Sequence, residues 1–215
     1  MNQDRRLDFL RFALAAEVLR FGSFKTKAGR MSPYFFNAGL FNSGALMSQL
    51  AAFYADTLAA DGPDFDVLFG PAYKGIPLST AVAMALSDRH NRETPFAYNR
   101  KEAKDHGEGG VLVGSPLKGR IMIIDDVVSA GTSVRESVGM IEQAGAQLAG
   151  VTVALDRQER GQGALSAIQE IEKNFNVPVI AIASLTDLVA LLEQEADLAE
   201  YMPQIKAYRD EYGVA

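Results

Sequence analysis

Two adjacent carboxylates, Asp125 and Asp126, stand in front of a loop of small residues, 129–133, that reads Ser-Ala-Gly-Thr-Ser. Unpaired N–H groups at the point where a loop enters a helix attract anions, and small residues let the backbone come close to a ligand. The loop therefore suits a phosphate group. The carboxylates would repel that phosphate, so they suit sugar hydroxyls or a magnesium ion instead. Together the two features indicate a phosphorylated sugar.

A second interpretation of the same stretch needs no ligand. An acidic pair after a strand is often a solvated strand end, and Thr132 or Ser133 would then cap the following helix. Short motifs of this kind also match by chance. Taken alone, these residues leave both interpretations open.

The surrounding elements predict how the stretch is positioned. Strand-like runs alternate with helical patterns over most of the chain. We interpret as strands the runs 66–71, 94–100, 121–124, 148–155 and 177–183, and as helices 43–60, 76–86, a run that begins after 133, 164–175 and most of the chain after 186. This alternation predicts an α/β fold, a doubly wound, mainly parallel sheet flanked by helices.

Ligands of such sheets bind beyond the carboxyl ends of the strands. Lys74 lies in a Gly/Pro-rich turn after the run 66–71, and a charged segment, 156–160, follows the run 148–155. We therefore expect Lys74 to open on the same edge as Asp125 and to face the same ligand. The simpler interpretation is that Lys74 is only a solvated turn residue.

The N-terminal part predicts a small hood outside the sheet. Apolar residues recur at helical spacing from about Asp4 to Arg20, and Gly22 is placed to end that helix. Residues 23–39 then predict a hairpin around an Ala28-Gly29 turn. Its notable side chains are Lys25, Lys27, Arg30, Tyr34, Phe35 and Phe36. A solvated basic turn over an apolar lid explains them as well as a binding site does. We expect one domain, 1–215, with a hood of about residues 1–40 and a core of about 41–215.

The segment 100–110 combines charge with glycines. Arg100, Lys101, Lys104 and His106 precede Gly107, Gly109 and Gly110 in the same short segment. This composition predicts an exposed, mobile loop. Such a loop is often a disordered surface turn. The functional alternative is an electropositive lid that closes on a polyphosphate and neutralises charge on a leaving group.

Composition excludes several classes of function. The chain has 215 residues, 48% of them hydrophobic, and a formal net charge of -6, which argues against a broad nucleic-acid or membrane surface. It has no cysteine and two histidines, so thiolate chemistry, disulfides and a histidine-rich metal site are excluded. We find no signal peptide and no membrane-spanning window, and expect a cytoplasmic protein.

The stretch 121–133, Ile-Met-Ile-Ile-Asp-Asp-Val-Val-Ser-Ala-Gly-Thr-Ser, resembles the signature of the type I phosphoribosyltransferase family. In that family the loop binds the 5-phosphate of phosphoribosyl pyrophosphate (PRPP), and the acids hold the ribose. Ser129 stands where the family often has Thr. Three further stretches, 24–39, 70–77 and 100–109, resemble motifs of the orotate-using members of this family. The resemblance covers essentially the whole chain.

The resemblance implies roles for individual residues. It implies PRPP binding by Lys27, Tyr73, Lys74, Arg100, Lys101, Lys104, His106, Asp125, Asp126, Val127, Val128, Ser129, Ala130, Gly131, Thr132 and Ser133. It implies orotate binding by Phe35, Phe36, Ser129 and Arg157. It implies catalytic roles for Lys74, Arg100, Lys104 and His106. No side chain is assigned as a direct metal ligand, since Mg²⁺ would be bound mainly through PRPP, near Asp125 and Asp126.

The implied reaction joins orotate to PRPP and gives orotidine 5′-monophosphate and pyrophosphate, a step of pyrimidine (UMP) biosynthesis. The implied cofactor is Mg²⁺, and the implied assembly is a homodimer in which Lys27, Lys101, Lys104 and His106 act in the neighbouring site. No nucleic-acid or membrane partner is expected. Two alternatives are a non-catalytic PRPP-sensing regulator and a purine phosphoribosyltransferase. The basic segment and the negative net charge speak against the regulator, and the aromatic hood with Arg157 speaks against the purine enzyme.

Overall fold

A six-stranded sheet organises the chain in the structure, a computed structural model that describes residues 2–26, 28–104, 110–128 and 131–214. The strands lie in the order β5 (Gly110–Gly114), β4 (Phe96–Lys104), β3 (Val67–Gly70), β6 (Arg120–Ile124), β7 (Gln147–Asp156) and β8 (Val179–Ser184). All neighbours are parallel except β4 and β5, which pair antiparallel. The predicted mainly parallel sheet is thus confirmed.

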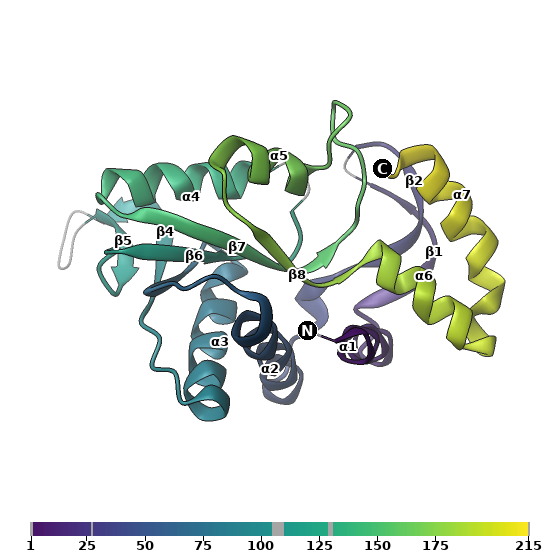
Figure 1. The fold of residues 1–215 in the computed structure, drawn as a ribbon, viewed down its shortest axis with the longest axis horizontal. Coiled ribbons are helices and arrows are strands. Elements are labelled where there is room, and N and C mark those ends of the chain that lie inside the picture. The colour runs from purple at the N-terminus through teal and green to yellow at the C-terminus, as the bar shows by residue number, and fades with distance from the viewer. Residues whose placement is uncertain (1, 27, 105–109, 129–130, 215) are drawn as a thin grey trace.

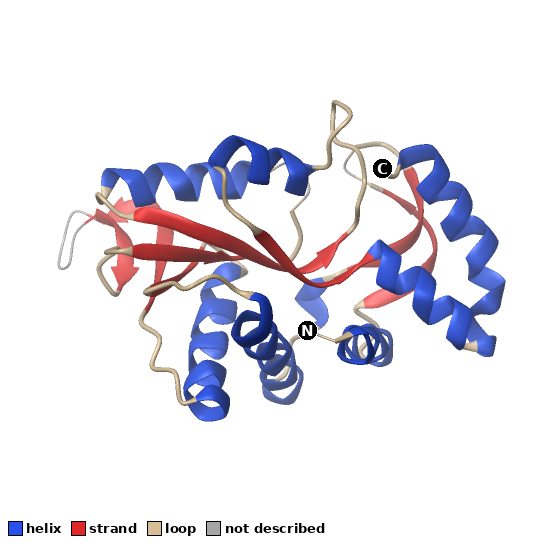
Figure 2. Cartoon of the chain, viewed as in Figure 1, coloured by secondary structure: helices blue, strands red, loops and turns tan. Residues whose placement is uncertain are grey.

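Helices cover both faces of the sheet, as a doubly wound fold requires (Figures 1 and 2). On one face lie α4 (Thr132–Gln143) and α5 (Ala167–Phe175). On the other lie α2 (Gly44–Asp61) and α3 (Gly75–His90). The bounds of these four helices are close to the predicted ones, although α3 continues four residues beyond its predicted end at residue 86.

Successive side chains of β6 point alternately into two separate apolar cores. Met122 and Ile124 belong to the core with α2 and α3, whereas Ile121 and Ile123 belong to the core with α4 and α5. All four side chains are fully buried. Successive side chains of a strand point to opposite faces, so a strand covered on both sides must be apolar throughout. This is why β6 reads as an uninterrupted apolar run.

The predicted hood is present at one end of the sheet. It consists of α1 (Gln3–Ala15) and a two-stranded antiparallel sheet of β1 (Leu19–Lys25) and β2 (Met31–Phe36). The predicted helix end at Gly22 is wrong. The helix ends at Ala15, because Glu17 adopts a positive φ of 55° and the chain then turns into β1. The short helix η1 (Ala38–Leu40) leads from the hood into α2.

The C-terminal elements pack against this hood. They are α6 (Leu185–Gln194), the short helix η2 (Ala196–Tyr201) and α7 (Met202–Tyr212). Phe21 of β1 stacks on Tyr201 at a centroid distance of 4.4 Å, and Tyr34 of β2 meets Tyr208 of α7 edge to face at 6.4 Å. One apolar core continues from α1 through α2 to α6. The single-domain division stays a prediction, and this shared core supports it.

The basic segment after residue 100 differs from its prediction. β4 continues to Lys104 and pairs with β5, which was not predicted, so residues 100–104 form a strand rather than a loop. Asn99 pairs with Leu112 and Lys104 pairs with Gly110, with an irregular register between them, so β5 holds the segment at both ends. The predictions for residues 105–109 lie outside the described residues. No helix in the described part of the chain is long and apolar enough to cross a membrane.

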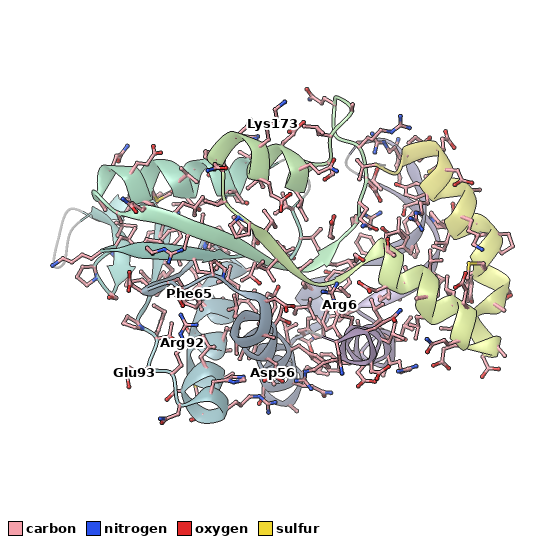
Figure 3. The ribbon with its side chains drawn as sticks, in the orientation of Figure 1. Arg6, Asp56, Phe65, Arg92, Glu93 and Lys173 are labelled. Atoms are coloured by element: carbon pink, nitrogen blue, oxygen red, sulfur yellow. The ribbon has the colours of Figure 1, made fainter. Side chains whose placement is uncertain are left out.

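One carboxylate ties three helices together on the α2 and α3 face. Asp56 of α2 is labelled in Figure 3. Arg89 Nη2 lies 2.8 Å from Asp56 Oδ2, and His90 Nε2 lies 2.7 Å from Oδ1. Arg5 of α1 also forms an ion pair with Asp56. The hood helix is therefore joined to the sheet-covering helices by charge as well as by apolar contact.

Candidate active site

The carboxyl ends of β3 and β6 meet at one edge of the sheet, and an ion pair joins their loops. Lys74 Nζ, at the start of α3, lies 2.6 Å from Oδ2 of Asp126, in the loop after β6. The Lys74 side chain is 58% exposed and that of Asp126 is 17% exposed. The predicted meeting of these two loops at one edge is thus confirmed, and the ammonium group remains accessible to a ligand.

Asp125 is held in a defined orientation beside this pair. Ser133 Oγ donates a hydrogen bond to Asp125 Oδ2 at 2.9 Å, and the Asp126 N–H donates to Asp125 Oδ1 at 2.9 Å. The Tyr54 hydroxyl donates to the Asp125 carbonyl oxygen at 2.8 Å. Burial, followed by the negative charge of Asp126, raises the pKa of Asp125 to about 6. The site therefore holds a carboxylate that gains from a hydrogen-bond donor or a cation.

The loop that precedes α4 has the form expected of an anion site. Gly131 is the N-cap residue with a φ of 67°, a conformation that favours glycine. No side chain among the described residues caps this helix. The interpretation of Thr132 or Ser133 as the cap is wrong, because the N-cap residue is Gly131 and the Ser133 hydroxyl donates to Asp125 instead. The first-turn N–H groups of α4 are thus left for a ligand.

Val127 and Val128 connect this loop to the two apolar cores. Val127 packs against the core on the α2 side and Val128 against the core on the α4 side. Their side chains therefore pack into the two cores, and their part in PRPP binding stays a prediction. The predictions for Ser129 and Ala130 lie outside the described residues.

The loop between β3 and α3 is shaped by close backbone packing. A Cβ on Gly70 would lie 2.0 Å from the Gly75 carbonyl oxygen, so only glycine fits there. The Asn99 side chain accepts a hydrogen bond from the Ala72 N–H at 2.8 Å and is buried. These contacts hold Tyr73, which is 69% exposed, and Lys74 at the sheet edge.

The basic end of β4 reaches the same loop. Lys101 Nζ lies 5.2 Å from the centroid of the Tyr73 ring. Arg100 Nη1 is buried and has no hydrogen-bond partner within the described residues. A buried guanidinium nitrogen without a partner is costly, and an anionic ligand would satisfy it. The side chain of Lys104 and the whole of His106 lie outside the described residues, as does Lys27.

The aromatic residues of the hood divide between two faces of β2. Phe35 is 39% exposed and stacks on Phe24 at 5.4 Å. Phe36 is 8% exposed and packs near Phe9 and Phe41. The ring available to a planar ligand is therefore that of Phe35.

Arg157 begins the loop after β7, the next strand beyond β6. Its Nε donates to Glu159 Oε1 at 2.9 Å and its Nη2 to Ser32 Oγ at 3.0 Å. Its guanidinium lies 4.2 Å from the centroid of the Tyr34 ring. Burial lowers the pKa of Arg157, but the neighbouring Tyr34 and Glu159 outweigh burial, and the net shift is upward. Arg157 is therefore cationic and fixed between the hood and the core.

A small pocket of about 160 Å³ opens beside the Lys74–Asp126 pair. Its remaining wall is mostly apolar and comes from η1, α2, α3 and β7. The lining residues include Ala38, Met47, Leu50, Pro77 and Ala154. The pocket therefore lies between η1, which follows the hood, and the sheet edge at Lys74 and Asp126.

Two carboxylates at this sheet edge could bind a metal ion. Asp125 and Asp126 supply the hard oxygen ligands that Mg²⁺ prefers. Over residues 2–26, 28–104, 110–128 and 131–214, no three His, Cys, Asp or Glu side chains gather in a way that would hold a metal ion. The donor set therefore fits an ion that brings further oxygen ligands with it, as a polyphosphate-bound Mg²⁺ does.

Several residues of the site were not predicted from sequence. Tyr54 lies in the predicted helix 43–60 and Asn99 in the predicted strand 94–100, and neither was singled out as a site residue. Ser32 and Glu159 were not singled out. The available signal was that buried hydroxyls, amides and charges need partners, but the partners come from distant segments.

Comparisons with known proteins agree with this geometry. A family model described as phosphoribosyl transferase domain matches residues 40–180. A protein of Laribacter hongkongensis (strain HLHK9) named orotate phosphoribosyltransferase is 62% identical over 211 residues, which cover 98% of this chain and 99% of that protein. A protein of the same name from Aliivibrio fischeri (strain MJ11) is 59% identical over 207 residues, which cover 96% and 97%.

Solved structures give the same result. The crystal structure of orotate phosphoribosyltransferase from Francisella tularensis has a TM-score of 0.87 and 41% identity, and the match covers 96% of this chain and 99% of that one. A Mycobacterium tuberculosis orotate phosphoribosyltransferase in complex with PRPP has a TM-score of 0.62 and 19% identity, and covers 87% of this chain and 93% of that one. The second likeness concerns the fold alone.

Proposed function

Because the chain belongs to the orotate phosphoribosyltransferases of the phosphoribosyl transferase domain family, we propose that it transfers the ribose 5-phosphate group of PRPP to orotate. The products are orotidine 5′-monophosphate and pyrophosphate, a step of pyrimidine (UMP) biosynthesis. The observation that carries the proposal is the Lys74–Asp126 ion pair beside Asp125 and the uncapped N-terminus of α4. It combines sites for a leaving group, a sugar and a phosphate at one sheet edge.

The part of PRPP that is retained binds at the β6–α4 loop in this proposal. The N–H groups around Gly131, Thr132 and Ser133 bind the 5-phosphate, because the start of α4 favours negative charge. Asp125 and Asp126 accept hydrogen bonds from the ribose hydroxyls. As anions near the anomeric carbon, they also stabilise positive charge that develops there.

Bond exchange at the anomeric carbon needs a cationic environment rather than a protein nucleophile. The bond from the anomeric carbon to the pyrophosphate oxygen breaks, and pyrophosphate leaves with the electron pair. A ring nitrogen of orotate forms the new bond to that carbon and loses its N–H proton to solvent. Lys74, Arg100, Lys104 and His106 neutralise the leaving pyrophosphate, with Tyr73 and Lys101 beside it. Nη1 of Arg100 is buried and has no hydrogen-bond partner among the residues that the structure describes, which supports this role.

Mg²⁺ is the cofactor in this proposal. When bound, it screens the charge of the pyrophosphate group. It is held mainly through PRPP, near Asp125 and Asp126, whose oxygen atoms suit a hard cation. Lys74 forms an ion pair with Asp126, and the exposed lysine can leave that carboxylate for the pyrophosphate group when PRPP binds.

Orotate lies between the hood and the sheet edge in this proposal. The exposed ring of Phe35 covers the base, the β2 backbone at Phe36 borders it, and the loop at Ser129 lies beside it. Arg157 binds the carboxylate. A base panel tests this choice: with PRPP and Mg²⁺, loss of orotate absorbance is compared with turnover of uracil, adenine and hypoxanthine. Preference for orotate supports the proposal, and failure of a folded sample to convert orotate contradicts it.

We further propose a cytoplasmic homodimer in which Lys27, Lys101, Lys104 and His106 complete the neighbouring site. Mixing inactive Lys104→Ala protein with inactive Asp125→Asn protein then restores part of the activity through hybrid dimers. If subunit exchange is demonstrated and no activity returns, these residues act within their own subunit.

A further inference from the structure

We propose that Glu159 is a positioning residue for base recognition, which fixes the Arg157 guanidinium so that a single edge is presented to the carboxylate of orotate. The inference rests on the proposed function. Glu159 lies two residues beyond Arg157 in the loop after β7, and both side chains are largely buried, at 15% and 16% exposure. The sequence resemblance assigned no role to Glu159.

The hydrogen-bond donors of Arg157 are distributed unequally. Glu159 Oε1 accepts from Nε at 2.9 Å and lies 2.6 Å from Nη2. Nη2 also donates to Ser32 Oγ at 3.0 Å. A guanidinium group has five N–H donors, and these contacts use the donors of Nε and Nη2. The contacts with Glu159 and Ser32 do not involve Nη1, so its edge is the one we assign to the ligand; the Tyr208 side chain also interacts with the Arg157 guanidinium.

Ser32 is itself fixed in the orientation that this arrangement requires. Its hydroxyl donates to the Tyr34 carbonyl oxygen at 2.8 Å, so its lone pairs are turned toward Arg157. Ser32 is buried in β2, and the Tyr34 ring lies under the guanidinium. The hood strand therefore limits the guanidinium from one side while Glu159 limits it from the other.

The negative charge of Glu159 has a consequence for selectivity. Because the buried pair of Arg157 and Glu159 carries no net charge, the site does not attract every anion equally. It recognises a planar carboxylate through the direction of the remaining N–H groups. This would favour orotate over bases that lack a carboxylate and over small free anions.

The test separates orientation from charge. Glu159→Ala is expected to raise KM for orotate about tenfold while KM for PRPP stays within about twofold. Glu159→Gln retains the acceptor oxygen for Nε and is expected to stay within about threefold of the wild type. Equal damage by both substitutions would mean that charge rather than position matters, and would overturn the inference.

A double-mutant cycle shows whether Glu159 acts through Arg157. The variant that combines Arg157→Ala with Glu159→Ala is expected to have the same KM for orotate as Arg157→Ala alone. Additive effects would contradict the inference, as would an equal rise in KM for PRPP. Ser32→Ala provides a second route if Glu159→Ala fails to fold; it should raise KM for orotate severalfold and also show no added effect in the Arg157→Ala background.

Two controls complete the design. Glu193→Ala removes an exposed ion pair with Lys206, at 3.6 Å, and should leave both KM values unchanged. The wild type is assayed in the same series. Failure of the wild type to convert orotate would contradict the proposed function, whereas an active wild type with an unaffected Glu159→Ala variant would overturn only the role of Glu159.

Discussion

Lys74 Nζ lies 2.6 Å from Asp126 Oδ2 and so joins the loops that follow β3 and β6. The two residues are 52 positions apart in sequence but reach the same edge because β3 and β6 are parallel neighbours. The lysine is the more exposed partner. It can therefore leave the carboxylate and follow the pyrophosphate group when PRPP binds.

The first prediction concerns this lysine. Lys74→Ala should lower kcat by about 10²-fold, because a cation that faces a developing charge contributes in the transition state. Steady-state kinetics with varied orotate and PRPP measures the effect. Lys118→Ala, at an exposed lysine that precedes β6, should behave as the wild type. Equal kinetics for Lys74→Ala and the wild type would remove Lys74 from the catalytic group.

A second prediction uses the raised pKa of Asp125. The pKa rises from an ordinary value of 3.8 to about 6, so the ionised carboxylate destabilises the folded state. The wild type should lose stability as pH rises from about 4 to about 6 through this group. Asp125→Asn should increase the free energy of unfolding at pH 7 by about 1–2 kcal/mol and lower activity strongly.

The check is urea denaturation of both proteins at several pH values. The advantage of Asp125→Asn should vanish as pH falls well below the ordinary pKa of 3.8, where the carboxyl is protonated in the folded and the unfolded state, and should grow toward pH 7. An advantage that is constant with pH would show that titration of Asp125 is not its cause.

The third prediction concerns Gly131, the N-cap residue of α4. Gly131→Ala introduces a side chain at a φ of 67° and should cost about 1 kcal/mol of stability. It should also weaken PRPP binding, measured by calorimetry, because the first-turn N–H groups shift. Gly139 lies on the same helix with open space around it, so Gly139→Ala should stabilise by about 0.5–1 kcal/mol without an effect on PRPP. Normal PRPP affinity in Gly131→Ala would contradict the binding of the PRPP phosphate by the N–H groups at the start of α4.

The fourth prediction concerns the charge cluster between the helices. Asp56→Ala leaves Arg5, Arg89 and His90 close together without their carboxylate. The free energy of unfolding should fall by about 1–3 kcal/mol, since Asp56 is largely buried although its partners are partly exposed. Asp8→Ala, which removes an exposed pair with Arg11, should change the free energy of unfolding far less. A similar loss of unfolding free energy in the two variants would show that the Asp56 cluster stabilises the fold no more than an exposed ion pair does.

The sequence was sufficient for the parts of the site that depend on local pattern. β6 is apolar because it is buried on both faces, and the small loop after Asp126 follows directly from its residue types. The position of Lys74 followed from the rule that parallel strands place their carboxyl ends together. Local patterns could not show the end of α1 at Ala15, because Val18 and Leu19 continue the helical spacing after the chain has turned.

Other features depended on contacts between distant segments. The continuation of β4 to Lys104 requires a partner strand, and β5 is short and rich in glycine, so its residues gave little signal. The hydroxyl of Tyr54 reaches Asp125 across 71 positions, and Arg157 reaches Ser32 across 125. No local spacing contains this information.

The most direct test of the account is product analysis with purified protein, orotate, PRPP and Mg²⁺. The wild type should form orotidine 5′-monophosphate and pyrophosphate in equal amounts. A folded variant that combines Asp125→Asn with Asp126→Asn should form neither at a comparable rate. Absence of both products with the wild type, or undiminished formation by the variant, would contradict the assignment of this sheet edge as the site of phosphoribosyl transfer.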